Sequence, residues 1–193
     1  MHIISKVSIA AGLIAAAIST PVSAADWSGF YVGAITTNDT GDYHEYSTPN
    51  SFVGPSYSLS GNTFGGIAGY NIDTGTIVYG AEIAISASGS ATTSGGPGQY
   101  SDNIVDGKIR IGYEFGNALL YGVGGMSAGN FEIYNSGVNV SGYNVGIGLD
   151  YLITPTTFVG IEYLSRSMNG VVLGPDDVEV NVDSISLRIG YLF

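Results

Sequence analysis

Hydrophobic and polar residues alternate with a period of two along most of the chain after its first 25 residues. This period is that of a β-strand with one buried face, and no later stretch shows the period of an amphipathic helix. Clusters of Gly, Ser, Asn, Asp and Pro separate the alternating segments. We therefore predict eight strands, approximately at residues 29–37, 62–72, 77–88, 103–115, 118–129, 142–153, 157–167 and 180–193.

The connections between these segments alternate between short and long. The short ones lie at 73–76, 116–117 and 154–156, and the long ones at 38–61, 89–102, 130–141 and 168–179. An even number of strands joined alternately by tight turns and large loops is typical of barrels of the bacterial outer membrane, whose tight turns face the periplasm. The pattern predicts an all-β fold, an eight-stranded antiparallel up-and-down transmembrane β-barrel.

The two faces of the predicted strands differ in chemistry. In segment 103–115, Ile109 and Ile111 fall on one face, while Lys108 and Arg110 fall on the other. Two later segments repeat this division between bulky apolar residues and glycines with isolated charges. A soluble barrel with an apolar interior would instead expose a face rich in Lys and Glu. We therefore predict that the bulky face contacts lipid and that the glycine-bearing face lines a closed interior.

Aromatic residues on the apolar face gather near the short turns, which predicts a girdle at one membrane interface. Ordinary sheet packing also favours Tyr and Phe, but it does not explain why they cluster at one end. The predicted girdle consists of Phe30, Tyr70, Tyr79, Tyr113, Phe115, Tyr121, Tyr151, Tyr191 and Phe193.

The chain begins like a secretory signal peptide. Lys6 precedes a short apolar run, and small residues follow up to Ala24. The run is shorter than the roughly 20 apolar residues that a membrane-spanning helix needs. We therefore predict a signal peptide at residues 1–24 and an outer-membrane β-barrel domain at 25–193. Cleavage after Ala25 is the alternative.

The overall composition excludes several classes of function. The formal net charge is −11 with only five Lys and Arg residues, whereas nucleic-acid binders need clustered cations to neutralise phosphates. We therefore expect no nucleic-acid partner. The chain has no cysteine, which excludes disulfide scaffolds, zinc sites built on thiolates and thiol catalysis.

Several motifs carry a family resemblance. Residues 26–33 (DWSGFYVG) resemble the opening of the small porin-like outer-membrane β-barrel proteins, the surface-antigen family of Gram-negative bacteria. Residues 144–155 (NVGIGLDYLITP) and 160–163 (GIEY) resemble strands six and seven of the OmpA-type eight-stranded membrane domain. The ending 186–193 (SLRIGYLF) is similar to the terminal strand of the family.

This resemblance implies an eight-stranded barrel in the outer membrane, in contact with outer-membrane lipid. It also implies that the assembly machinery of the outer membrane recognises the terminal strand through its final Phe193. One position departs from the pattern, because Gly160 stands where the OmpA-type domain has an interior arginine. The central gating ion pair of that domain is therefore not carried over to this chain.

The charges on the interior face are predicted to pair. Glu82 and Arg110 each lie five residues from the short-turn end of their strands, and so do Glu162 and Arg188. We predict the pairs Glu82–Arg110 and Glu162–Arg188, which barrel shear can shift by a step or two. Further interior charges include Lys108 and Asp150.

These charges form either an ion path or a plug of paired side chains. We favour the plug, because eight strands leave an interior just wide enough for side chains to fill and because an unpaired buried charge is costly. A wide nutrient pore is excluded on the same ground.

One candidate site for catalysis or cofactor binding stands out in the first long connection. Relatives in the family that the chain resembles suggest haem binding, and Tyr43, His44 and Tyr46 are possible iron ligands in this loop. His44 with Glu45 and a serine could also serve a lipid-A-modifying enzyme, although this combination is not specific. We predict neither an enzyme nor a cofactor, and keep haem or small-ligand binding, a narrow channel and a lipid-A-modifying enzyme as alternatives.

The long connections are acidic and lack Lys and Arg. We place in or beside them Asp39, Asp42, Glu45, Asp102, Glu132, Asp176, Asp177 and Glu179. Such loops are usually a solvated surface, although divalent cations could bridge them to the phosphates of lipopolysaccharide. We predict an outer-membrane barrel with a structural or surface-interaction role. Its expected partners are outer-membrane lipid and lipopolysaccharide, with an external protein or haem ligand possible through the long loops.

Overall fold

The computed structural model describes residues 26–48, 51–52, 57–93, 98–99, 103–133, 136–171 and 177–193. All regular secondary structure in these ranges is β-strand. No helix within them is long and apolar enough to cross a membrane. The predicted signal peptide and both candidate cleavage positions lie outside the described residues.

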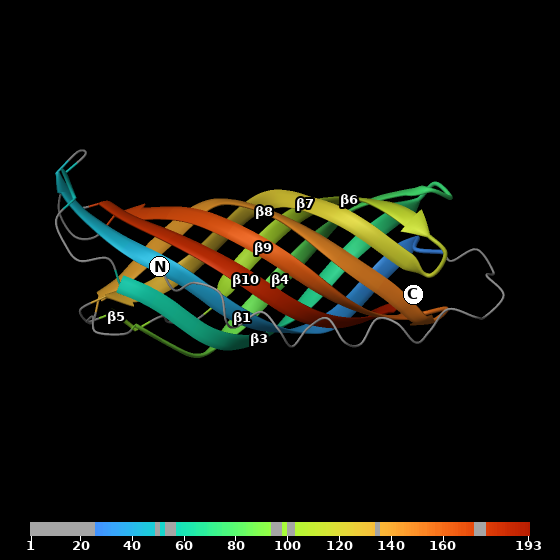
Figure 1. The fold of residues 1–193 in the computed structure, drawn as a ribbon, viewed down its shortest axis with the longest axis horizontal. Helices are drawn as coiled ribbons and strands as arrows, with labels where there is room; N and C mark the ends of the chain where they lie inside the picture. The colour runs from blue at the N-terminus through green and yellow to red at the C-terminus, as the bar shows by residue number, and fades with distance from the viewer. Residues whose placement is uncertain are drawn as a thin grey trace, which may run out of the picture.

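Eight long strands form one closed antiparallel sheet, as predicted (Figure 1). Each strand pairs with its neighbours, and the last strand pairs with the first, which closes the barrel. Two short strands of two residues each, β2 and β5, lie near the end of the barrel opposite the short turns. The strands are β1 (Gly29–Thr48), β2 (Ser51–Phe52), β3 (Tyr57–Asp73), β4 (Ile77–Thr93), β5 (Gly98–Gln99), β6 (Ile104–Phe115), β7 (Ala118–Ile133), β8 (Ser136–Thr154), β9 (Thr157–Val171) and β10 (Asp177–Leu192).

The strand ends at the short turns lie within one residue of their predicted positions, but the opposite ends extend further in all the long strands except β6. β1 continues to Thr48, past the predicted end at residue 37, and pairs with β10 as far as Tyr46. The extended parts are rich in Thr, Asn, Ser and Gly, so they lack the hydrophobic alternation on which the prediction depended. Their backbones nevertheless pair, so the barrel wall continues into the predicted long loops.

The predicted orientation of the two faces is confirmed. Ile109, Ile147 and Leu187 point outward and are more than half exposed. Arg110 and Arg188 point inward and are buried. An apolar outside with buried charges is the reverse of a soluble barrel, so the outward face is suited to lipid.

The predicted outward position of one residue in the aromatic girdle is wrong. Tyr121 in β7 points into the barrel and is only 2% exposed. The prediction assumed that the bulkier face of each strand meets lipid. In β7 that assumption fails at Tyr121, because Gly122 and Gly124 lie on the outward face between Leu120 and Met126. Bulk therefore did not indicate the lipid side in this strand. The other girdle residues are exposed near the short turns, except Tyr151, which is partly buried.

The outward apolar surface ends part of the way up the barrel. We call it the apolar belt; its upper edge is formed by Phe64, Ile85, Val105, Met126, Tyr143, Tyr163 and Ile185. Beyond it the outward residues that the structure describes, other than Ala128, are polar, as at Asn38 and Asn62, whose side chains hydrogen-bond at 3.0 Å. The barrel wall therefore rises above the level of the lipid tails on the side away from the short turns.

Apolar side chains close the interior near both ends of the described barrel. Near the short turns, Trp27 and Phe158 pack with ring centroids 6.1 Å apart, and Leu119, Leu152 and Leu192 are buried beside them in one cluster. Toward the other end, further inward residues are buried, namely Val140, Met168, Val180 and Val182. Most inward polar residues lie between these two apolar layers, whereas Asn71 and Glu114 lie near the short turns.

Candidate functional site: polar layers inside the barrel

Six charged side chains meet at the middle of the barrel and form what we call the central layer. The members are Glu82 of β4, Lys108 and Arg110 of β6, Asp150 of β8, Glu162 of β9 and Arg188 of β10. Each is at most 5% exposed. Three carboxylates face three cations, so the formal charge of the layer is zero.

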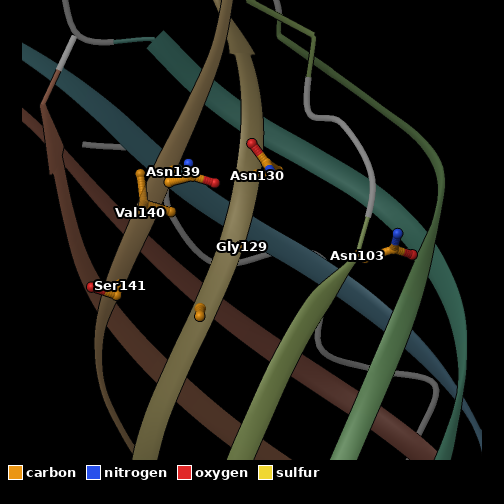
Figure 2. Close-up of a pocket in the computed structure, with 7 residues that line it drawn as sticks. Asn103, Gly129, Asn130, Asn139, Val140 and Ser141 are labelled. Atoms are coloured by element: carbon orange, nitrogen blue, oxygen red, sulfur yellow. The ribbon is translucent and has the colours of Figure 1, made fainter.

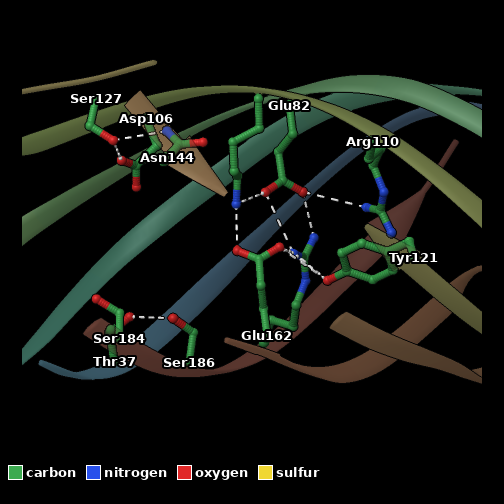
Figure 3. Close-up of polar contacts among 12 residues, drawn as sticks. Thr37, Glu82, Asp106, Arg110, Tyr121, Ser127, Asn144, Glu162, Ser184 and Ser186 are labelled. Atoms are coloured by element: carbon green, nitrogen blue, oxygen red, sulfur yellow. Dashed lines mark hydrogen bonds and ion pairs between the residues drawn. The ribbon is translucent and has the colours of Figure 1, made fainter. Parts of the chain in front are cut away.

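Glu82 and Glu162 are bridged by two cations (Figure 3). Lys108 Nζ lies 2.7 Å from Glu82 Oε1 and 2.5 Å from Glu162 Oε1. The guanidinium of Arg188 places Nη2 2.5 Å from Glu82 Oε2 and Nη1 2.9 Å from Glu162 Oε2. These shared contacts join four strands across the lumen, so each of the two carboxylates is held by more than one positive charge.

The third carboxylate, Asp150, is held by two arginines. Arg110 Nη2 donates to Asp150 Oδ2 at 2.8 Å, and Arg188 Nε lies 3.3 Å from Asp150 Oδ1. The guanidinium of Arg110 also lies over the ring of Tyr121, 3.9 Å from its centroid. This cation–π contact gives a buried charge a further favourable partner.

Both predicted ion pairs are in contact, within a larger network than expected. Arg110 Nη1 lies 3.5 Å from Glu82 Oε2, and Arg188 Nη1 lies 2.9 Å from Glu162 Oε2. In the register, however, Glu82 lies opposite Lys108, and Arg110 lies opposite Gly80. The pair is therefore diagonal, as barrel shear allows. Lys108 and Asp150, also predicted among the paired interior charges but without named partners, belong to the same network.

Two tyrosines in this network were not anticipated. Tyr31 Oη donates to Glu82 Oε2 at 2.6 Å and accepts from Arg110 Nη1 at 3.0 Å. Tyr121 Oη donates to Glu162 Oε2 at 3.2 Å and accepts from Arg188 Nη1 at 2.9 Å. The sequence pattern could have predicted the inward position of Tyr31, because Phe30 was expected outside and successive residues of a strand alternate between its two faces. No comparable signal existed for Tyr121, because Gly122 and Gly124 follow it on the outward face.

A second polar group, the outer layer, lies farther from the short turns. Arg166 of β9 binds Asp106 of β6 with two hydrogen bonds, at 2.6 Å from Nη2 and 2.9 Å from Nε. Ser127 Oγ donates to the same carboxylate at 2.6 Å, and Asn144 Nδ2 donates to Ser127 Oγ at 2.8 Å. These side chains come from four consecutive strands, β6 to β9, and cross the lumen together.

Asp39 also belongs to the outer layer, although the sequence placed it among the solvated loop acids. It is 6% exposed because β1 continues past the predicted loop start. Thr63 Oγ1 donates to Asp39 Oδ2 at 3.1 Å, and Ser184 Oγ donates to Oδ1. Arg166 Nη1 is 3.9 Å away. Two carboxylates share one cation here, so the formal charge of the outer layer is −1.

The candidate haem ligands lie in β1 rather than in a loop. His44 is partly buried, and its Cα lies opposite that of Glu179 in β10. The side chains of Tyr43 and Tyr46 lie outside the described residues. Within the described part of the chain, no group of three or more His, Asp or Glu side chains is arranged to hold a metal ion.

Comparison with known proteins agrees with this geometry. A 22 kDa outer membrane protein of Rhizobium leguminosarum bv. viciae is 32% identical over 147 residues, which is 72% of this chain and 64% of that protein. The alignment therefore spans less than two thirds of that relative's length.

Solved structures share the fold at low identity. The outer membrane protein OprG of Pseudomonas aeruginosa has a TM-score of 0.57 and 15% identity, over 86% of this chain and 96% of OprG. Neisserial surface protein A has a TM-score of 0.54 and 17% identity, over 86% and 98%. The family model for the outer membrane protein beta-barrel domain matches residues 8–193. The chain therefore belongs to the outer membrane protein β-barrel domain family, and its localisation is the bacterial outer membrane.

Proposed function

We propose that the protein is a closed outer-membrane barrel with a structural or surface-interaction role, not a pore and not an enzyme. The observation that carries the proposal is the central layer, in which every buried charge has an opposite charge within 3.5 Å. Apolar side chains flank it on the side of the short turns and beyond the outer layer. A permeating ion would have to separate these pairs and also cross the apolar layers, and both steps are costly.

The same pairing argues against catalysis inside the barrel. A general base needs a carboxylate or imidazole that is free to accept a proton. The carboxylates of the central and outer layers are instead held by cations or hydroxyl donors, as shown for Glu82, Asp150 and Asp39. A structural role requires nothing more from these groups than their mutual attraction.

The outer surface is the more suitable place for contact with other molecules. The barrel wall continues beyond the apolar belt, and its cations, Lys108, Arg110, Arg166 and Arg188, are all buried inside. External partners would therefore meet a neutral to acidic surface. The last strand supports a second contact, with the assembly machinery, because Tyr191 and Phe193 are exposed on its outward face.

Planar-bilayer recording tests the closed state. We expect the wild-type protein to give no sustained stepwise current. Arg110→Ala should destabilise the barrel, because it leaves Asp150 and Glu82 with one cation fewer, and should change the current little. Urea unfolding in detergent and gel mobility before and after boiling report on stability in parallel.

A large rise in current with unchanged unfolding would show that the charges gate an ion path. A sustained wild-type current would contradict the proposal directly. Arg110→Lys, which keeps the positive charge, serves as the matched control and should lie between the wild type and Arg110→Ala.

A further inference from the structure

A shallow notch of about 330 Å³ opens on the outer wall of the barrel (Figure 2). Its lining consists of the polar Asn103, Asn130, Asn139 and Ser141 and of the small or apolar Ala128, Gly129 and Val140. The hydrogen-bonding side chains in this set are amides and a hydroxyl, and none carries a charge. The notch is therefore built to contact neutral polar groups.

The notch exists because β6 begins lower than its neighbours. The last pair between β6 and β7 joins Val105 to Ala128, whereas β7 continues to Ile133 and pairs with β8 along its whole length. Asn103 precedes β6 with φ at 70°, a left-handed conformation that asparagine tolerates better than most residues. This turn of the chain borders the notch beside Gly129 and Asn130.

The height of the notch relative to the membrane is set by its neighbours. Met126 and Tyr143 form the upper edge of the apolar belt on β7 and β8, and both are largely exposed. Ala128 and Ser141 follow two residues farther out on the same strands. The notch thus begins where lipid tails give way to headgroups.

An apolar trough lies below the notch along β7, with the exposed side chain of Met126 between the two. Its floor is formed by the outward Gly122 and Gly124. In the register, Gly124 lies between Ile109 and Val145, and Gly122 lies between Ile111 and Ile147. These exposed branched side chains form a ridge on either side of two positions that have no side chain.

Internal packing does not require glycine at the trough positions. A Cβ added at Gly122 or Gly124 would come no closer than 3.9 Å to any other part of the protein. At the inward Gly148, by contrast, a Cβ would overlap the ring of Tyr121. The outward glycines therefore leave open a channel in the lipid-facing surface that the fold itself does not need.

We propose that the notch and trough together bind one outer-leaflet lipid with an uncharged saccharide headgroup region. The sugar hydroxyls would bond the amides of Asn130 and Asn139, and an acyl chain would lie over Gly124 and Gly122. Phosphate groups are disfavoured as the main contact, because the four cations of the barrel wall are buried inside it. The lipid A and core sugars of lipopolysaccharide carry such hydroxyls.

Native mass spectrometry of the whole barrel in detergent tests the site. The probes are diglucosyl diacylglycerol and phosphatidylglycerol with the same acyl chains. We expect the glucolipid to bind more tightly to the wild type. Asn130→Ala combined with Asn139→Ala should weaken this binding about tenfold, because several hydrogen bonds are lost.

Filling the trough is the second variant. Gly122→Leu combined with Gly124→Leu should weaken the glucolipid at least as much and leave folding unchanged, since both side chains have open space. Gly66→Leu is the matched control, because Gly66 also faces outward, on β3, with no other atom closer than 3.6 Å to an added Cβ. Equal binding of the two lipids, or equal loss in Gly66→Leu, would overturn the proposal. So would trough and asparagine variants that bind the glucolipid like the wild type.

Discussion

The central and outer layers are both buried and polar, but they hold their carboxylates in different ways. In the central layer three carboxylates meet three cations, and Glu82 contacts Lys108, Arg110 and Arg188 together. In the outer layer one cation, Arg166, serves two carboxylates. Hydroxyl donors supply the remaining contacts of Asp39.

This difference shows that a barrel interior can satisfy buried acids either by charge or by neutral hydrogen bonds. The stability of the central layer depends on all six charges, since loss of any one of them leaves an opposite charge buried without its partner. In the outer layer, the neutral donors already stabilise an excess negative charge. The same chemical change should therefore have different consequences in the two layers.

The largest expected effect is the loss of an arginine. Arg188→Met removes the contacts to Glu82, Glu162 and Asp150 and should lower the free energy of unfolding by about 3–5 kcal/mol. Arg166→Met should cost less, about 2 kcal/mol, because hydroxyl donors remain on both of its carboxylates. Urea unfolding in detergent, followed by fluorescence, measures both. Equal losses would remove the distinction between the layers.

Fluorescence is a suitable readout for this measurement. Trp27 is the only tryptophan and is buried against Phe158 in the apolar layer near the short turns. Its emission reports on the barrel interior without any added label. Arg188→Lys, which keeps the charge but not the planar fork, should fall between the wild type and Arg188→Met.

Neutralising one acid in each layer gives a sharper contrast. Asp150→Asn leaves Arg110 and Arg188 with an excess positive charge and should cost about 3 kcal/mol. Asp39→Asn removes the excess negative charge of the outer layer and should change stability by no more than about 1 kcal/mol, in either direction. The two variants, compared in one denaturant series, test the charge count. A stability loss at Asp39 as large as that at Asp150 would contradict it.

Removing a hydroxyl should produce the opposite order, with the larger loss of stability in the outer layer. Tyr121→Phe takes one donor from Glu162, which keeps Lys108 and Arg188, and should cost less than about 1 kcal/mol. Ser184→Ala takes a main donor from Asp39 and should cost about 1–3 kcal/mol. Thermal unfolding in the same detergent compares them. A larger loss for Tyr121→Phe would mean that hydroxyls matter equally in both layers.

The central layer was more predictable than the outer one for a geometric reason. Glu82, Arg110, Glu162 and Arg188 lie at the same distance from short turns, and the short turns fix the depth of each strand. Asp39 lies far from its short turn, in a polar stretch without hydrophobic alternation. Its strand continues only because β3 and β10 pair with it on both sides.

The misplacement of Tyr121 has a similar origin. Period-two alternation states that residues 119, 121 and 123 share a face, but it does not state which face is inside. In most strands bulk answered that question. In β7 it did not, since the outward face there includes Gly122 and Gly124. Only the closed sheet showed which side met the lumen.

By itself, the sequence determined that this chain forms eight antiparallel strands with tight turns at one end, an apolar exterior and charges inside. Those features follow from local alternation and turn chemistry, which each segment carries on its own. The tertiary structure decided the height of the wall, the diagonal contacts of Glu82 with Arg110, the second polar layer and the notch above β6. These depend on shear and closure, which relate strands distant in sequence and are properties of the whole cylinder.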